Sequence, residues 1–361
     1  MGGKIKRLPL FQIKLGKEFV NSSFLESLTQ KISRNRRDFL DDYGVEIPKV
    51  NIIDSVELGE WEYEIRVSGV PVQRFSCKEG CFLSFDFGDV TRKMKGEPTK
   101  DPSFGMEAMW IPDAEIGAAK NNGYHVYPHD IIVITNLVEV IRKNMKAIIT
   151  SQYVEELLTE VEEENATLVR RIRSKYEYNA LFIIQGVLAS LLEECVSIRN
   201  IVSILEVISD ATDKDSIATM TEHARQILGP AIVSNICHNG ELNVIRISED
   251  TMEYILAYCS DEKCNREFRD DFIFKSNRAA GAVRAKDRMP VLLVPDEIRK
   301  AVWTVVNPHL PGIMVLSLSE VQAAIDTLPS LKLNFLTKIS VENSARTWSI
   351  NTSPRDAVPP A

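Results

Sequence analysis

Two pairs of residues have the types and spacing that could support catalysis or metal binding. Cys237 and His238 are the residue types of a thiol nucleophile and its base, but adjacent side chains rarely face each other, and the sequence places no carboxylate to orient the imidazole. His125 and His129 have the i, i+4 spacing of a metal-binding pair on a helix, but Pro128 between them favours a strand or a loop. We therefore expect neither a thiol active site nor a histidine-bound metal, and we expect the histidines at the surface.

Cysteine spacing indicates no metal module either. The closest pairs, Cys77/Cys81 and Cys259/Cys264, are separated by three and four residues, whereas zinc modules repeat C-x2-C. Six cysteines in 361 residues are too few for a disulfide scaffold, so we expect reduced thiols. The signatures G-x-x-x-x-G-K-[ST], G-x-G-x-x-G, H-E-x-x-H and G-x-S-x-G are missing from the sequence. We expect no metal, no cofactor and no enzymatic activity, and favour a binding platform.

Length and charge narrow the class of protein further. A chain of 361 residues predicts two or three domains, and 44% hydrophobic with 26% charged residues is typical of a folded globular protein. The net charge of −8 disfavours a nucleic-acid partner. No apolar run approaches the ~18 residues of a membrane span, and no apolar secretory signal opens the chain. We interpret the acidic run 155–164 as a solvated helix face.

Hydrophobic periodicity predicts the elements that must position any site. A helix is expected over 23–40, with a capping box of Ser23 and Glu26 and a stop at Gly44. Alternation predicts strands over 61–67 and 82–87, and 88–105 reads as one long loop. A further helix begins near residue 131. Taken by themselves, the phenylalanines at 85, 87 and 104 are expected in the core, because large apolar side chains are usually buried.

The second half of the chain changes from helical to mixed. Residues 151–229 read as four helices, the third capped by Ser197 and the fourth ending at Gly229-Pro230. Thereafter we expect an Asn239-Gly240 turn followed by four strands and two helices, with residues 260–288 left open as a helix, a loop or both. The predicted segments are strands at 242–247, 291–294, 313–316 and 331–341 and helices at 252–258 and from Pro295, with a disordered tail from 348.

One stretch resembles a known family. Residues 96–111, G-E-P-T-K-D-P-S-F-G-M-E-A-M-W-I, resemble the signature G-E-x-T-x-D-P-x-F-G-L-x-A-x-W-I of flagellar export gates of the FlhA family. Further family motifs follow in the same order, so the resemblance extends from about residue 8 to 345. They lie at Gly123-Tyr124 with Val126, Ile134–Leu137, Leu191–Glu206 and Pro290–Val294.

The resemblance implies a multi-subdomain α/β (α+β) fold and a place in protein export. The chain would be the cytoplasmic part of the gate, at the cytoplasmic face of the bacterial inner membrane, with the membrane-spanning N-terminal half absent. Its expected partners are flagellar export chaperone–substrate complexes, other export-apparatus proteins and copies of itself in a homo-oligomeric ring. The implied subdomains are 1–79 with 129–148, an inserted 80–128, a helical 149–231 and an α/β 232–347, followed by a disordered tail at 348–361.

The resemblance also implies a docking pocket. Its residues would be Phe85, Phe87, Asp101, Phe104, Met106 and Thr135. Two of these aromatics replace an aliphatic residue and a proline of the family pattern, and Asn136 replaces the usual histidine. We expect a partner helix to bind in this pocket as in a groove. Its apolar anchor residues would enter the pocket, and Asp101 and Thr135 would orient it.

Three alternatives remain open at this point. Residues 196–200, V-S-I-R-N, also resemble the export gates of virulence (injectisome) type III secretion systems. A thiol enzyme and an RNA-binding module are two further possibilities, both disfavoured by the observations above. The flagellar interpretation is preferred because D-P-S-F-G at 101–105 follows the flagellar pattern.

Overall fold

The computed structural model describes residues 8–258, 266–284, 288–310 and 312–341. The chain divides into two compact units, Met1–Thr221 and Glu222–Ala361. Three four-stranded sheets with helices packed beside them confirm the predicted mixed α/β class. The Cys259/Cys264 pair and the tail predicted from residue 348 lie outside the described residues.

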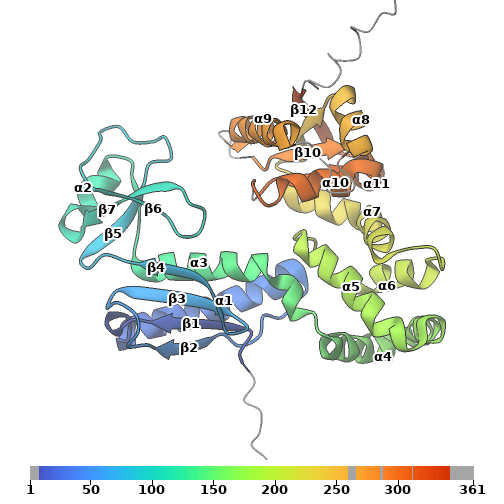
Figure 1. Ribbon diagram of the computed structural model, residues 1–361, viewed down its shortest axis with the longest axis horizontal. Coiled ribbons are helices and arrows are strands. Elements are labelled where there is room, and N and C mark those ends of the chain that lie inside the picture. Colours follow the sequence, from blue (N-terminus) through green and yellow to red (C-terminus); the bar gives the residue numbers. More distant parts are fainter. Residues whose placement is uncertain (1–7, 259–265, 285–287, 311, 342–361) are drawn as a thin grey trace, which may run out of the picture. The chain divides into compact units, whose positions relative to one another are not determined.

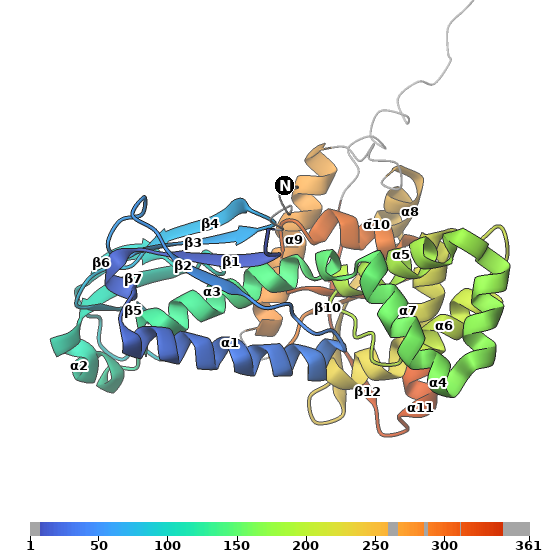
Figure 2. The same ribbon diagram turned by 90° about the horizontal axis from the view of Figure 1, so that it is seen from below.

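The first sheet of the first unit has the strand order β2-β1-β3-β4. Its strands are β1 (Phe11–Leu15), β2 (Asn51–Asp54), β3 (Glu62–Val67) and β4 (Val70–Ser76). The predicted alternation on β3 holds in part: Tyr63 and Ile65 are fully buried, but Glu64 between them is also buried, at 8% exposure. The helices α1 (Ser22–Tyr43) and α3 (His129–Lys143) lie side by side against this sheet (Figures 1 and 2).

The ends of α1 agree only in part with the sequence pattern. Gly44 ends the helix in the left-handed conformation, with φ of 72°, as predicted. The capping box at Ser23 is wrong, because the Asn21 side chain caps the helix instead and accepts the Phe24 N–H at 2.9 Å. The Ser23 hydroxyl donates to that same Asn21 oxygen, so it supports the cap from inside the helix.

The second sheet of the first unit has the order β6-β7-β5-β8. Its strands are β5 (Cys81–Phe85), β6 (Glu97–Lys100), β7 (Glu107–Pro112) and β8 (His125–Tyr127), with the short helix α2 (Ile116–Asn121). The prediction of one loop over 88–105 is wrong, because β6 pairs antiparallel with β7 inside it. Pro98 is compatible with β6 because this is an edge strand.

Four longer helices follow in the chain, and four short 3-10 turns are distributed along its described first half. The helices are α4 (Ser151–Tyr176), α5 (Ala180–Glu193), α6 (Ile201–Asp210) and α7 (Ile217–Ile236), and the 3-10 turns are Lys17–Phe19, Asp113–Glu115, Met145–Ile148 and Glu177–Asn179. Ser197 is not the predicted cap of the third helix, because α6 begins only at Ile201. The preceding segment is held away from helical geometry, since the Ile198 N–H bonds to the Tyr43 carbonyl at 2.9 Å.

The predicted helix end at Gly229-Pro230 is also wrong. Helix α7 continues through Pro230 to Ile236. Gly229 does not end the helix but allows the backbone of α7 to pack closely against Glu320. A Cβ atom built at residue 229 would lie 2.4 Å from the carbonyl oxygen of Glu320.

The second unit is built on a parallel sheet of order β11-β10-β9-β12. Its strands are β9 (Glu241–Ile247), β10 (Val291–Val294), β11 (Met314–Ser317) and β12 (Lys332–Ile339), and its other helices are α8 (Glu249–Tyr258), α9 (Arg266–Arg284), α10 (Asp296–Val306) and α11 (Leu318–Thr327). The β-α-β arrangement of β10, α10 and β11 and the last strand are as predicted. Asn239 and Gly240, with φ of 53° and 75°, make the predicted turn.

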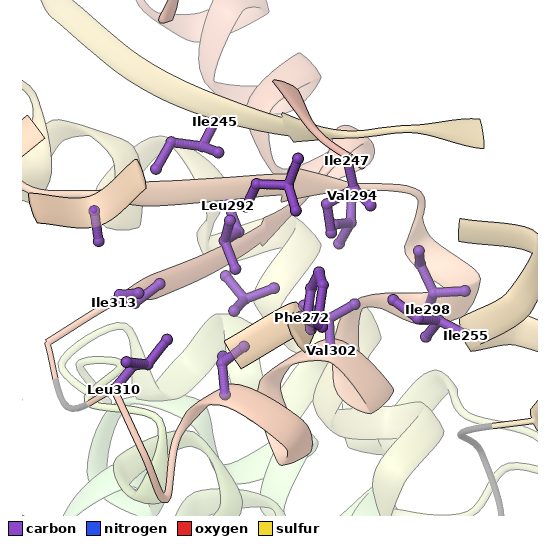
Figure 3. Packing of buried hydrophobic residues seen from close by; sticks show 14 of the residues in the cluster. Ile245, Ile247, Ile255, Phe272, Leu292, Val294, Ile298, Val302, Leu310 and Ile313 are labelled. Carbon is purple, nitrogen blue, oxygen red and sulfur yellow. The ribbon is translucent and has the colours of Figure 1, made fainter. Parts of the chain in front are cut away.

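An apolar cluster joins one face of this sheet to its helices. Figure 3 shows Phe272 of α9 and Val302 of α10 directed at each other below the strand residues Leu292 and Val294. Phe272, Leu292 and Val302 are each fully buried. Burial of side chains of this size is worth about 1.5–3 kcal/mol each, so this cluster contributes strongly to the stability of the unit.

Buried charges hold α7 to the same unit. Arg225 of α7 pairs with Glu320 of α11 at 2.7 Å, and both side chains are 1% exposed. Arg299 of α10 pairs with Glu222 of α7 at 2.5 Å.

No helix in the described part of the chain is both long and apolar enough to cross a membrane.

Candidate docking site

An apolar depression in the first unit brings the six predicted docking residues together. Its volume is about 200 Å³. Phe85, Phe87, Asp101, Phe104, Met106 and Thr135 all line it, together with Leu83, Ser103, Tyr127, Ile131 and Ile132. The residues come from β5, β8, α3 and the two loops that follow β5 and β6, so distant parts of the sequence build one surface.

An aromatic stack forms one wall of the depression. Phe85 is the last residue of β5 and is 7% exposed, and its ring lies parallel to that of Phe87 at 5.5 Å between centroids. Phe87 lies two residues beyond the strand and is 52% exposed, so the core position expected for it is wrong. The rings of Tyr127 and His125 contact the pair at 5.7 and 5.0 Å. The wall is therefore fixed at its base and accessible at its rim.

A second part of the lining is a loop held by Asp101. One carboxylate oxygen of Asp101 accepts the Ser103 N–H at 2.8 Å, and the other accepts those of Phe104 and Met106 at 3.0 and 3.1 Å. Gly105 completes the turn with φ of 70°, a conformation that favours glycine. Phe104 and Met106 are thereby presented with exposures of 52% and 39%, so Phe104 is not a core residue as expected.

This geometry changes the interpretation of Asp101. The side chain is 6% exposed and its oxygens already accept three backbone N–H groups of its own loop. A partner would have to compete with these charge-assisted bonds to be oriented by the carboxylate. Asp101 is thus a positioning residue, which shapes the wall that carries Phe104.

Helix α3 supplies the floor of the depression. Ile131 and Thr135 are four residues apart and Ile132 and Thr135 three, so all three lie on one face of α3. The next residue, Asn136, points elsewhere: it is buried and donates from its side-chain amide to the Tyr63 hydroxyl at 2.8 Å. The histidine position of the family pattern therefore faces the first sheet.

Some lining residues were not predicted from the sequence. Tyr127 belongs here because β8 pairs antiparallel with β5 and sets Tyr127 opposite Leu83. A weak signal existed, since β8 leads within a few residues into the predicted helix. Gln73 of β4 donates to the Pro102 carbonyl at 2.6 Å and connects the loop to the first sheet, which no local pattern indicates.

The other candidate chemical sites do not assemble. His125 is in β8 and His129 begins α3, so they share no helix face. His129 is packed among aromatic rings, with the centroids of Trp61 and Trp110 at 5.2 and 5.9 Å, so it is not the surface residue expected. Burial lowers the pKa of His129. Within the described ranges no group of three or more metal-ligating side chains occurs.

The thiols lack the environment of a nucleophile. Burial raises the pKa of Cys237 above its ordinary value, and burial raises the pKa of Cys195 to about 11. A raised pKa leaves a smaller fraction of reactive thiolate near neutral pH. Cys237 directly follows the last residue of α7, and its N–H donates to the Val233 carbonyl at 2.9 Å. His238 forms a bridge with Glu241 through backbone atoms.

Comparisons with known proteins find relatives by sequence and solved structures of the same fold. Flagellar biosynthesis protein FlhA of Borreliella burgdorferi is 29% identical over 334 residues, which cover 90% of this chain and 46% of that protein. FlhA of Treponema pallidum is 31% identical over 312 residues, covering 81% and 43%. The chain therefore spans less than half the length of these curated relatives.

A solved structure agrees at the level of the fold. The CdsV protein of Chlamydia pneumoniae superimposes with a TM-score of 0.77 and 19% identity, covering 94% of this chain and 100% of that one. The model of the FHIPEP family matches residues 4–326, a range that contains the export-gate signature and every residue lining the depression. This match confirms the resemblance found in the motifs: the chain belongs to the FHIPEP family.

Proposed function

We propose that this chain is the cytoplasmic domain of a flagellar type III protein export gate and that the depression docks chaperone–substrate complexes. The domain would lie at the cytoplasmic face of the bacterial inner membrane, joined to a membrane-spanning part of the gate. Relatives 29% and 31% identical that are flagellar FlhA proteins support the flagellar assignment. We retain the four-subdomain division implied by the family resemblance, with the depression at the junction of the first two subdomains.

The observation that carries the docking proposal is the exposure of apolar side chains around a preformed hollow. Phe87 and Phe104 each line the depression and are 52% exposed, whereas Leu83, Phe85 and Ile132 of the same lining are buried. Partly exposed aromatic side chains next to a buried base are typical of hot spots that take up an apolar anchor. A partner helix with apolar residues at i and i+4 fits this arrangement.

Solved structures with the same fold support self-association. One is the nonameric SctV-C domain of enteropathogenic E. coli (EPEC), with a TM-score of 0.72, 19% identity and coverage of 94% of this chain and 100% of that one. Another is the complex of the Chlamydia CdsV and CdsO proteins, with a TM-score of 0.76 at the same identity. We extend both features to this chain: a homo-oligomeric ring and a further partner from the export apparatus.

The test is calorimetric binding of this chain to flagellar chaperone–substrate complexes from the same organism. Phe104→Ala and Phe87→Ala should each weaken binding by about 30-fold, the equivalent of ~2 kcal/mol for a hot-spot residue. Phe182→Ala is the matched control, because Phe182 on α5 is similarly exposed, at 66%, and does not line the depression. It should bind as the wild type does.

Melting curves must accompany each variant. Because Phe104 is half-exposed, we expect its truncation to cost less than the ~3–5 kcal/mol of a core phenylalanine. Asp101→Ala removes the acceptor of three loop N–H groups and should weaken binding by displacing Phe104. Asp101→Asn keeps one acceptor oxygen and should have the smaller effect.

The outcomes separate the alternatives. Binding that survives both phenylalanine truncations would overturn the docking assignment. The wild-type chain could instead show no binding to flagellar chaperone–substrate complexes and bind those of a virulence secretion system. This result would replace the flagellar assignment by the injectisome one.

A further inference from the structure

The docking depression is built from two layers of the first unit. Phe85, Tyr127 and the loop 101–106, which carries Phe104, belong to the second sheet. The floor is helix α3, which packs beside the first sheet. The distance from the loop to the floor therefore depends on how the second sheet is attached to the first.

The loop 101–106 holds its own shape. Besides the three N–H groups bound by the Asp101 carboxylate, the Asp101 N–H donates to the Met106 carbonyl at 2.9 Å. The Gly105 N–H donates to the Asp101 carbonyl at 3.1 Å. All these bonds lie within the loop, so its position over α3 depends on contacts made outside it.

Gln73 of β4 makes such an outside contact. Its side-chain amide donates to the Pro102 carbonyl at 2.6 Å, and the two residues are 29 positions apart in the sequence. Strand β4 is an edge strand of the first sheet, and Gln73 is half-buried there. Pro102 directly follows Asp101, so the bond holds the loop close to Phe104.

A β-bulge directs Gln73 to this position. The register of β3 and β4 shifts at Val72, which has no partner on β3. As a result Gln73 lies opposite Ile65, which is fully buried under the helices, whereas regular pairing would set it opposite Glu64 on the other face. Bulges reorient the side chains of a strand and are frequent beside functional sites.

Phe75 makes a second contact from the same face of β4. Its ring centre lies 6.2 Å from that of Trp110 on β7 and 6.1 Å from that of Tyr63 on β3. Trp110 is buried and pairs with Leu83, which belongs to the buried part of the lining. Strand β4 thus contacts the second sheet through an apolar ring and its loop through a hydrogen bond.

We infer that Gln73 is a positioning residue of the depression, whose bond to Pro102 holds Phe104 over α3 and sets the width of the hollow. An apolar contact such as Phe75–Trp110 is non-directional, whereas a hydrogen bond fixes both a distance and a direction. The width in turn determines how large an apolar anchor the depression accepts. This last consequence rests on the proposed docking function, but the positioning role does not.

The methyl group of Met106 reports the position of the loop without any partner. Met106 lines the depression together with aromatic rings, so the NMR signal of its isotope-labelled methyl group depends on where the loop lies. Gln73→Leu removes the donor at similar size and should shift or broaden this signal. Gln73→Lys keeps a donor long enough to reach the Pro102 carbonyl and should restore it. Met145, fully buried outside the depression, is the reference signal.

Gln185→Leu is the matched control. Gln185 on α5 makes the same kind of bond, from its side-chain amide to the Ile149 carbonyl at 2.8 Å, and does not line the depression. Its loss should lower the urea midpoint about as much as Gln73→Leu does, but it should leave the Met106 signal unchanged. A purely structural role of Gln73 would make the two variants alike.

Calorimetric binding to chaperone–substrate complexes tests the consequence for docking. Gln73→Leu should weaken binding about fivefold, the effect of one hydrogen bond. In the background of Phe104→Ala the same change should weaken binding by less than about twofold, because Gln73 acts through the loop that carries Phe104.

The positioning role and the docking function can fail separately. An unchanged Met106 signal in Gln73→Leu, or equal fold losses with and without Phe104→Ala, would overturn the inference. If Gln73→Leu moves the Met106 signal while the wild type binds none of the complexes, the positioning role stands and the docking function is wrong.

Discussion

Asn136 of α3 donates a hydrogen bond of 2.8 Å from its side-chain amide to the hydroxyl of Tyr63 on β3. Asn136 is 2% exposed and Tyr63 is fully buried, so the bond forms away from solvent. Thr135, the preceding residue, faces the docking depression. The bond therefore fixes the floor of the depression to the first sheet.

Removal of this bond should be measurable as a loss of stability. Asn136→Ala leaves the Tyr63 hydroxyl buried without its partner, which costs about 1–3 kcal/mol. In urea unfolding, the double variant Asn136→Ala/Tyr63→Phe should be more stable than the sum of the single effects predicts. Additivity of the two single changes within about 0.3–0.5 kcal/mol would show that the bond contributes nothing.

His129 should make stability depend on pH in the weakly acidic range. Burial lowers its pKa below that of the unfolded chain, so the unfolded state takes up the proton first. Its contribution is complete above the unfolded pKa of about 6.5 and is lost as the pH falls below that value. Urea midpoints at pH 7.5 and 5.5 should therefore differ less in His129→Gln than in the wild type.

The control for that experiment is His125→Gln. His125 is 47% exposed and its ring contacts Phe87 rather than the buried tryptophans. We expect this variant to retain the pH slope of the wild type. A slope that disappears in His125→Gln and persists in His129→Gln would contradict the assignment.

The thiols should react slowly. Because burial raises the pKa of Cys237, and that of Cys195 to about 11, both should alkylate with iodoacetamide at pH 7.5 more slowly than free cysteine. Peptide mass mapping separates the individual cysteines. Rapid labelling of Cys237 near neutral pH would restore the thiol-enzyme alternative.

Glu320 should be among the most sensitive positions of the second unit. Glu320→Ala removes the carboxylate that pairs with the buried guanidinium of Arg225, a change that costs about 3–5 kcal/mol. The Ser317 N–H also loses its acceptor, at 2.6 Å, which weakens the start of α11. Urea unfolding followed by hydrogen exchange should show the loss in α7 and α11.

A surface ion pair provides the matched comparison. Arg266 and Asp270 lie one turn apart on α9 at 3.7 Å, with side-chain exposures of 87% and 57%. Asp270→Ala should cost no more than about 1 kcal/mol, because exposed pairs are screened by water. Equal losses from Asp270→Ala and Glu320→Ala would show that burial of the pair is energetically irrelevant.

The secondary structure could be predicted from the sequence where one apolar face of a helix or strand packs into the core. The stripes of the middle helices, the alternation on β3 and the β-α-β arrangement around α10 follow from local periodicity. The predicted helix ends are wrong where a residue contacts a partner that is distant in the sequence. Ile198 leaves the helical conformation for a bond to Tyr43, and Gly229 is small because Glu320 lies against it.

The docking residues could be predicted as a set but not in their roles. The family motifs contain Phe104 and Asp101 together, but they do not indicate that Asp101 accepts hydrogen bonds from the backbone of its own loop. Composition rules misplace Phe87 and Phe104 in the core, because such rules describe single residues and not sites. The contribution of Tyr127 depends on strand pairing, which the sequence does not specify.

The approach of Gly229 to Glu320 also constrains how this chain can diverge. Arg225 lies one helical turn before Gly229 on α7, so the same backbone contact sets the distance across the Arg225–Glu320 pair. A methyl group at 229 would force α7 and α11 apart and stretch the pair. We expect residue 229 to covary with the two charges among relatives: glycine where both charges are present, and larger residues only where apolar side chains have replaced them.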